Sequence, residues 1–218
     1  CILNSAIQLP SFPAVIQRVL QLVEDPESSA QEMVDVIQYD QSITGNVLRV
    51  CNSAYFDLRH PVHSLRDAVA MIGFDRLVEV ILQNNSAQLI SRACPGYDLD
   101  DGELWRHSVS CALLSQIISI RLNQPPSPTR FTAALLHDIG KVILSGFVRE
   151  HFEEIRKIVR DGGCSFSEAE KEVLGIDHAE LGGKISERWQ FPKAIVLAIR
   201  YHHTPLLAPA HHEIVHLI

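Results

Sequence analysis

Apolar residues recur at the spacing of an α-helix along almost the whole chain, and this periodicity constrains the fold more than any other feature. In residues 13–24 the apolar positions follow the i, i+1, i+4, i+5, i+8 order of one helix face: Val15, Ile16, Val19, Leu20 and Val23. The sequence has no convincing run of alternating apolar and polar residues, which is the pattern of a half-buried strand. With 218 residues, 46% of them hydrophobic, the chain can bury a core. The sequence therefore predicts an all-α protein.

Capping residues mark where the predicted helices begin. A Ser or Asp followed three residues later by an acidic residue is typical of a helix N-terminus, and we interpret four such pairs as helix starts: Ser29–Glu32, Ser64–Asp67, Ser165–Glu168 and Asp177–Glu180. The predicted helices cover residues 13–24, 29–39, 42–54, 64–72, 74–90, 103–122, 129–144, 150–161, 165–174, 177–189 and 192–201.

A break in the helical pattern divides the chain. Residues 94–98, Cys-Pro-Gly-Tyr-Asp, combine turn-forming residues and interrupt the periodicity. We therefore expect two parts, an N-terminal helical bundle of about five helices in residues 1–97 and a second helical unit in residues 98–218, packed against each other.

Charge and composition exclude several classes of protein. The net charge is −7, which argues against holding nucleic acid by general charge. No apolar run approaches the roughly 20 residues of a membrane-spanning helix, and no signal peptide opens the chain. The five cysteines are widely spaced without a CxxC pair, which indicates reduced thiols rather than a disulfide framework or a zinc finger. These features favour a cytoplasmic protein.

The strongest local signal for chemistry is residues 135–141, Leu-Leu-His-Asp-Ile-Gly-Lys. Adjacent side chains on a helix lie about 100° apart, so His137 and Asp138 can both reach one ion beside it, and their donor atoms suit Zn, Fe, Mn or Ni. Lys141 shares the face of His137 and suits an anion such as phosphate, while Gly140 lets another group approach closely. The alternative is a helix end with a solvated Asp-Lys pair and one core histidine.

Four further histidines lie on or at the end of three other predicted helices. Taken alone, His107 reads as a core histidine bonded to a carbonyl, and His178 as a surface histidine beside a helix cap. His202 and His203 end a helix, where the helix dipole favours cations. Taken together with the His-Asp pair, they fit a metal site assembled from facing helices of one bundle. The predicted metal ligands are His107, His137, Asp138, His178, His202 and His203.

The order of these residues resembles that of a known superfamily. The HD metal-dependent phosphohydrolases carry similar motifs, which correspond here to His107, His137-Asp138, Gly140-Lys141, His178 and His202-His203. Four segments of the first half are similar to the HDOD domain, the HD-related output domain of bacterial signalling proteins: Leu9–Pro13, Ser28–Asp40, Leu48–Tyr55 and Ala68–Gly73. The resemblance covers essentially the whole chain and implies an all-helical regulatory domain.

Two departures from the wider superfamily bear on activity. The HD-GYP relatives carry Gly-Tyr-Pro soon after the paired histidines, whereas residues 204–207 are Thr-Pro-Leu-Leu, so the motif does not support cyclic di-GMP hydrolysis. HD enzymes also close the site with a later aspartate, but no aspartate follows Asp177. The closing ligand is therefore expected beyond Ile218, replaced or absent. Three residues near the end of the sequence could replace the closing aspartate, although a polar tail is the simpler interpretation of them: His211, His212 and Glu213.

Two functions follow from the resemblance. The first is a bacterial signal-transduction module that retains a metal site and acts through a regulatory protein partner or a phosphate-bearing small ligand, without a membrane. The alternative is a metal-dependent phosphohydrolase or phosphodiesterase acting on a nucleotide or cyclic nucleotide. In that case one or two divalent ions activate water, Asp138 bridges them, and Lys141 steadies the developing negative charge. A scaffold that only packs would leave the histidines unexplained.

DNA binding is a third interpretation. Residues 32–54 read as helix, turn, helix, and the second helix offers Asn46, Arg49 and Asn52 for contacts with DNA. The acidic chain makes nucleic acid an unexpected partner.

Overall fold

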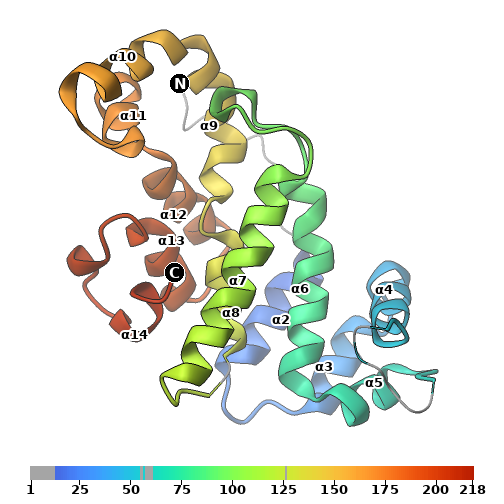
Figure 1. Cartoon of the computed structure of the whole chain (residues 1–218). Coiled ribbons are helices and arrows are strands. Elements are labelled where there is room, and N and C mark those ends of the chain that lie inside the picture. Colours follow the sequence, from blue (N-terminus) through green and yellow to red (C-terminus); the bar gives the residue numbers. More distant parts are fainter. Residues whose placement is uncertain (1–12, 55, 57–60, 126) are drawn as a thin grey trace.

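The computed structural model of the chain describes residues 13–54, 56, 61–125 and 127–218, and it confirms the all-α prediction (Figure 1). Within those ranges there is no β-strand. Two parts of the predicted motifs lie outside the described residues. They are Leu9–Pro13, except for Pro13 itself, and Tyr55. The helices are α2 (Ala14–Glu24), α3 (Ala30–Ile37), α4 (Gln41–Cys51), α5 (Leu65–Ile72), α6 (Phe74–Ile90), η1 (Pro95–Tyr97), α7 (Glu103–Arg121), α8 (Pro128–Leu136), α9 (Ile139–Glu150), α10 (Phe152–Gly162), α11 (Phe166–Leu174), α12 (His178–Arg188), α13 (Lys193–Tyr201), η2 (Pro205–Leu207) and α14 (His212–Val215).

The four predicted N-terminal caps are confirmed. Ser29 and Ser165 each form a full capping box with the glutamate three residues later. The side chains of Ser64 and Asp177 each accept a hydrogen bond from the backbone N–H three residues on. Because these caps satisfy N–H groups that lack a partner within the helix, they fix where α3, α5, α11 and α12 begin.

The centre of the fold is α8, whose residues from Arg130 to Leu136 are all buried. This helix packs against α6 from the first half of the chain and against α7 and α13 from the second. Buried apolar residues of both halves form one continuous core. The division at residue 97 stays a prediction, but α8 joins the halves and leads directly into the His-Asp segment.

One stretch corrects the expectation that no segment could span a membrane. Residues Pro128–Glu150, which include α8 and α9, have the length and apolarity of such a helix, because an 18-residue window within them has a mean hydropathy of 1.4. In the structure, 72% of this window is buried inside the protein. This burial is typical of a core helix, so the hydropathy is explained by packing against the neighbouring helices.

Two helix predictions were wrong in an informative way. The single helix expected over residues 129–144 is broken at His137 and Asp138, because the chain turns there between α8 and α9. The face of α7 that carries His107 was interpreted as core. Instead the His107 side chain is 54% exposed, and Leu114 and Ile118 below it are 54% and 43% exposed.

The motif around Asn52 has a structural role. Its side-chain amide donates to the Val62 carbonyl at 2.8 Å, and its carbonyl oxygen accepts from the Val62 N–H at 2.7 Å. These two bonds fasten the chain before α5 to the end of α4. Asn52 is therefore engaged within the fold, which weakens the DNA-binding interpretation of this helix.

Candidate metal centre

The turn between α8 and α9 places two polar side chains in the interior. His137 is 6% exposed and Asp138 is 2% exposed. Asp138 precedes α9 but does not cap it with its side chain. The carboxylate instead accepts a hydrogen bond from the Lys141 ammonium at 2.7 Å. Lys141 was expected on the face of His137, four residues before it, but its partner is Asp138, three residues before it. The helix break is therefore what directs His137 and Asp138 into one site.

Histidines from three other helices converge on the Asp138 carboxylate. His107 comes from α7, His178 from the first turn of α12, and His202 from the end of α13. Oδ2 lies 3.4 Å from Nε2 of His137 and 3.6 Å from Nε2 of His107. Oδ1 lies 3.4 Å from Nε2 of His178 and 3.6 Å from Nε2 of His202. The two oxygens therefore face different pairs of histidines.

Three of these rings are held in place through Nδ1. Carbonyl and carboxylate oxygens only accept hydrogen bonds, so Nδ1 donates in each case and Nε2 is left facing Asp138. Such outer partners are typical of metal-binding histidines, because they fix both the tautomer and the ring orientation. The acceptors are the Ala134 carbonyl for His137 at 2.7 Å, the Ile199 carbonyl for His202 at 2.8 Å and the Glu170 carboxylate for His178 at 2.7 Å.

The centre of the cluster contains two buried atoms without a hydrogen-bond partner among the described residues, Asp138 Oδ1 and His202 Nε2. Burial, followed by the nearby charge of His137, lowers the pKa of His202 to about 2, so this ring is neutral. Burial alone would raise the pKa of Asp138, but the His137 ring and the Lys141 ammonium hold it well below its usual range. Two buried acceptors thus face each other, an arrangement that is costly unless a cation lies between them.

The remaining predicted ligand, His203, lies at the edge of the cluster. Its Nε2 is 2.8 Å from Nε2 of His178, so one of the two rings donates to the other. Burial, and secondarily the charge of His178, lower the pKa of His203, which keeps its ring neutral. Among the described residues, none of the groups arranged to hold a metal includes the three suggested replacements for the closing aspartate: His211, His212 and Glu213.

Sequence analysis missed Glu170, which supports the site from α11. Glu170 is fully buried and accepts hydrogen bonds from the Tyr97 hydroxyl at 2.6 Å and from both the N–H and the Nδ1 of His178. The sequence does contain a signal for a buried Glu170. Val173 and Leu174 follow it at i+3 and i+4, which places Glu170 on the apolar face of its helix. An ionisable residue at such a position needs a buried partner.

We expect Glu170→Gln to weaken metal binding by about 10–100-fold, the usual effect of losing an outer partner of a ligand. Glutamine is uncharged and has one carboxamide oxygen, so it cannot accept from the Tyr97 hydroxyl on one oxygen and from the His178 N–H and Nδ1 on the other, as the carboxylate does. Competition with a chromophoric chelator measures the affinity. Glu172→Gln, an exposed change on the same helix, is the matched control. Equal affinities for the two variants would contradict this role of Glu170.

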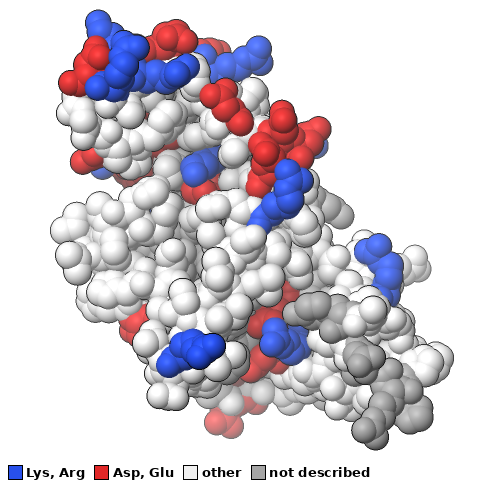
Figure 2. All heavy atoms as spheres, viewed as in Figure 1, with Lys and Arg blue, Asp and Glu red and all other residues white. Residues whose placement is uncertain are grey.

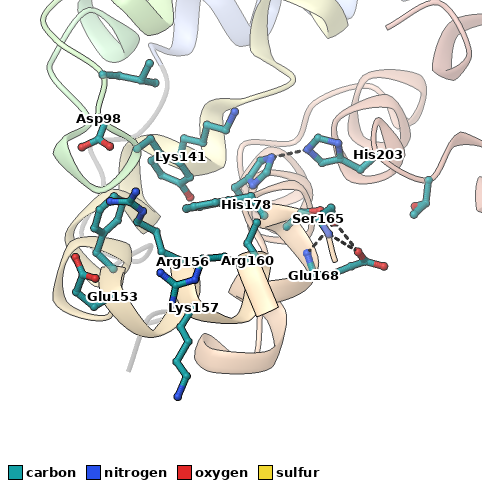
Figure 3. A pocket seen from close by; sticks show the side chains of 17 residues that line it. Asp98, Lys141, Glu153, Arg156, Lys157, Arg160, Ser165, Glu168, His178 and His203 are labelled. Carbon is teal, nitrogen blue, oxygen red and sulfur yellow. Dashed lines mark hydrogen bonds between the residues drawn. The ribbon is translucent and has the colours of Figure 1, made fainter. Parts of the chain in front are cut away.

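A cavity of about 1110 Å³ opens beside the cluster and shares Lys141, His178 and His203 with it (Figure 3). Tyr97 lines the same wall, and the Lys141 ammonium lies 5.6 Å from the centre of its ring. The opposite wall is formed by α10, which contributes Arg156 and Arg160. Figure 2 shows charged side chains of both signs gathered over α10 and α11, in contrast to the largely uncharged surface over α7. The charged residues that line the cavity are Asp98, Lys141, Glu153, Arg156, Lys157, Arg160 and Glu168.

The fold and the cluster define an all-helical domain with a buried His/Asp centre. Residues 9–205 match the family model of the HDOD domain. The chain therefore belongs to the HDOD family, which confirms the resemblance drawn from its motifs.

Solved structures agree with this assignment. An HDOD domain protein of unknown function from Geobacter sulfurreducens is 28% identical, with a TM-score of 0.80 over 99% of this chain and 74% of that one. A candidate signal transduction protein from Marinobacter aquaeolei is 26% identical, with a TM-score of 0.78 over 99% of this chain and 48% of that one. A candidate phosphohydrolase from Shewanella amazonensis, 24% identical with a TM-score of 0.76 over 99% of this chain and 76% of that one, shares the fold.

A curated relative from Treponema pallidum is 19% identical over 206 residues. The match covers 94% of this chain but only 39% of that protein. The chain thus spans less than half the length of this relative.

Proposed function

We propose that this HDOD domain is a regulatory module of the bacterial cytoplasm that binds a divalent metal ion at the Asp138 cluster. The ligands would be His107, His137, Asp138, His178 and His202, with His203 at the edge. One observation carries the proposal: the unpartnered oxygen of Asp138 faces the unpartnered, unprotonated nitrogen of His202 in a buried space. A bound cation would satisfy both atoms at once.

The donor atoms limit which metals the site would take. Imidazole nitrogens with one carboxylate suit Fe, Mn, Zn or Ni better than Mg or Ca, which prefer oxygen ligands. The two oxygens of Asp138 face separate pairs of histidines, which supports room for a second ion. We therefore expect one or two ions per chain.

The module would act through a phosphate-bearing small ligand or a regulatory protein partner. The cavity supports the first. Lys141 and His203 on one wall and Arg156 and Arg160 on the other offer donors to phosphate oxygens. A ligand there would touch Lys141 and His178, so its binding would respond to whether the metal centre is loaded.

A second function, hydrolysis of a phosphate ester, is favoured by the position of Lys141 between the cluster and the cavity. A divalent ion in this centre would lower the pKa of a bound water and polarise a phosphoryl oxygen. Lys141 would stabilise the negative charge that develops on the phosphate. The ring of His203, held against His178, would line the cavity beside the bound phosphate ester.

Metal analysis and a turnover screen test both functions. We expect anaerobically purified or reconstituted protein to hold one or two equivalents of Fe, Mn, Zn or Ni. Failure to take up any of them would overturn the proposed metal site. The loaded protein is then assayed against cyclic nucleotides, dinucleotides and nucleoside phosphates. Turnover that His137→Ala abolishes would establish the phosphohydrolase, and no turnover with any of the four metals favours the regulatory module.

A further inference from the structure

Cys111, which sequence analysis interpreted only as one of the reduced thiols, lies beside the cluster. It follows His107 by one turn of α7, so both side chains leave the same face of the helix. Its Sγ is 3.7 Å from Nε2 and 4.0 Å from Nδ1 of His107. Cys111 Sγ, one ring nitrogen of His107 and one of His137 all lie within 4.8 Å of one another.

The thiol is not committed to a hydrogen bond with the ring. An in-plane bond to one imidazole nitrogen would leave the other nitrogen much farther away, whereas the two distances here are similar. The sulfur therefore does not lie along the lone-pair direction of either nitrogen. The His107 side chain is 54% exposed, which leaves room for small adjustments of the ring, and its Nε2 already lies 3.6 Å from Asp138 Oδ2.

From this geometry we propose that Cys111 is a thiolate ligand of a metal ion held on the Oδ2 side of Asp138, together with His107 and His137. The inference rests on the proposed metal site and adds a ligand to it. Zn–S and Zn–N bonds of about 2.3 and 2.0–2.1 Å put tetrahedral ligand atoms roughly 3.5 Å apart. Three spacings on this side are close to that value: 3.7 Å from Cys111 Sγ to His107 Nε2, 3.6 Å from His107 Nε2 to Asp138 Oδ2, and 3.4 Å from His137 Nε2 to the same oxygen.

The thiolate makes the two sides of Asp138 chemically different. The Oδ2 side would offer two nitrogens, one oxygen and one sulfur, a set that selects zinc or iron over manganese. The Oδ1 side, with His178 and His202, offers only nitrogen and oxygen. Binding on the Oδ2 side displaces the thiol proton to solvent and moves the Lys141 ammonium off Oδ2, where it now lies at 2.7 Å. Lys141 is thereby released toward the cavity.

Cobalt substitution tests the ligand directly. The reduced protein is titrated with Co²⁺ under anaerobic conditions and its absorption spectrum is recorded. We expect visible ligand-field bands and a near-ultraviolet sulfur-to-cobalt charge-transfer band. Cys111→Ser should keep the visible bands and lose the charge-transfer band. Cys94→Ser is the matched control, because Cys94 is a buried thiol that is also close enough to interact electrostatically with Asp138 and Lys141.

The outcomes separate this inference from the proposed function. Two results would overturn the role of Cys111 and leave the metal site intact. One is visible bands without a charge-transfer band in the wild type, and the other is a charge-transfer band that survives Cys111→Ser. No cobalt uptake by the wild type would overturn the metal site itself, and the thiolate ligand with it. If Cys111→Ser does not fold, X-ray absorption of the zinc-loaded wild type decides, since a sulfur shell at about 2.3 Å is required.

Discussion

Replacing Asp138 by asparagine is expected to abolish metal binding by the purified protein. Four surrounding histidines face the Asp138 carboxylate, at distances of 3.4–3.6 Å. The amide keeps the shape of the carboxylate but removes its charge, so nothing offsets the transfer of a divalent ion into this buried space. We expect the affinity to fall well beyond the ~10–100-fold loss that is typical for an outer partner.

Elemental analysis after gel filtration measures this effect. Metal content should fall from one or two equivalents per chain to none. Asp161→Asn is the matched control, because Asp161 lies at the exposed end of α10 and, within the part of the chain that the structure describes, pairs only with Arg160. Circular dichroism establishes that both variants keep their helices. Stoichiometric metal in Asp138→Asn would mean that the ion is held elsewhere.

The helices could be predicted from sequence because their signals are local. Apolar spacing and caps such as Ser29 and Asp177 act within a few residues, and the structure places the helices close to the predicted bounds. The break at His137 left no local signal, because apolar residues continue through both α8 and α9. The carboxylate of Asp138 turns inward to face histidines from three other helices, and only the folded chain brings them there.

The supporting residues show the same limit. Glu170 and Cys111 act through partners that are distant in sequence: Glu170 on His178 and Tyr97, and Cys111 through its position beside His137. The exposure of His107 likewise depends on which face of α7 the other helices cover. Residue types and their order predicted a set of ligands. Which of these residues face Oδ1 of Asp138 and which face Oδ2 depends on how the helices pack.

Gly140→Ala is expected to destabilise the fold and to empty the metal centre, although Gly140 supplies no ligand. Sequence analysis interpreted this glycine as leaving room for a close approach, and the structure identifies the approaching group. A Cβ at this position would collide with the carbonyl oxygen of His178, and would lie 2.8 Å from its carbonyl carbon and 2.9 Å from the Gly182 nitrogen. These atoms belong to the backbone of α12, so they cannot rotate away as a side chain would.

Relief of this clash requires α9 and α12 to move apart. That movement carries His178 away from Asp138 and opens the core between the helices, where Ile139 and Leu181 are buried. Overpacking usually costs about 1–3 kcal/mol, and a clash with rigid backbone should fall at or above the upper end. Urea unfolding with metal analysis of the same sample measures both effects.

Gly146→Ala provides the matched control for this substitution. Gly146 lies on the exposed face of the same helix, and a Cβ there has no atom within 4 Å. Alanine should stabilise α9 by roughly 0.5–1 kcal/mol, because glycine is the poorer helix former. The same chemical change should therefore have opposite signs six residues apart on one helix. Wild-type stability and full metal content in Gly140→Ala would show that the contact between α9 and α12 does not position His178.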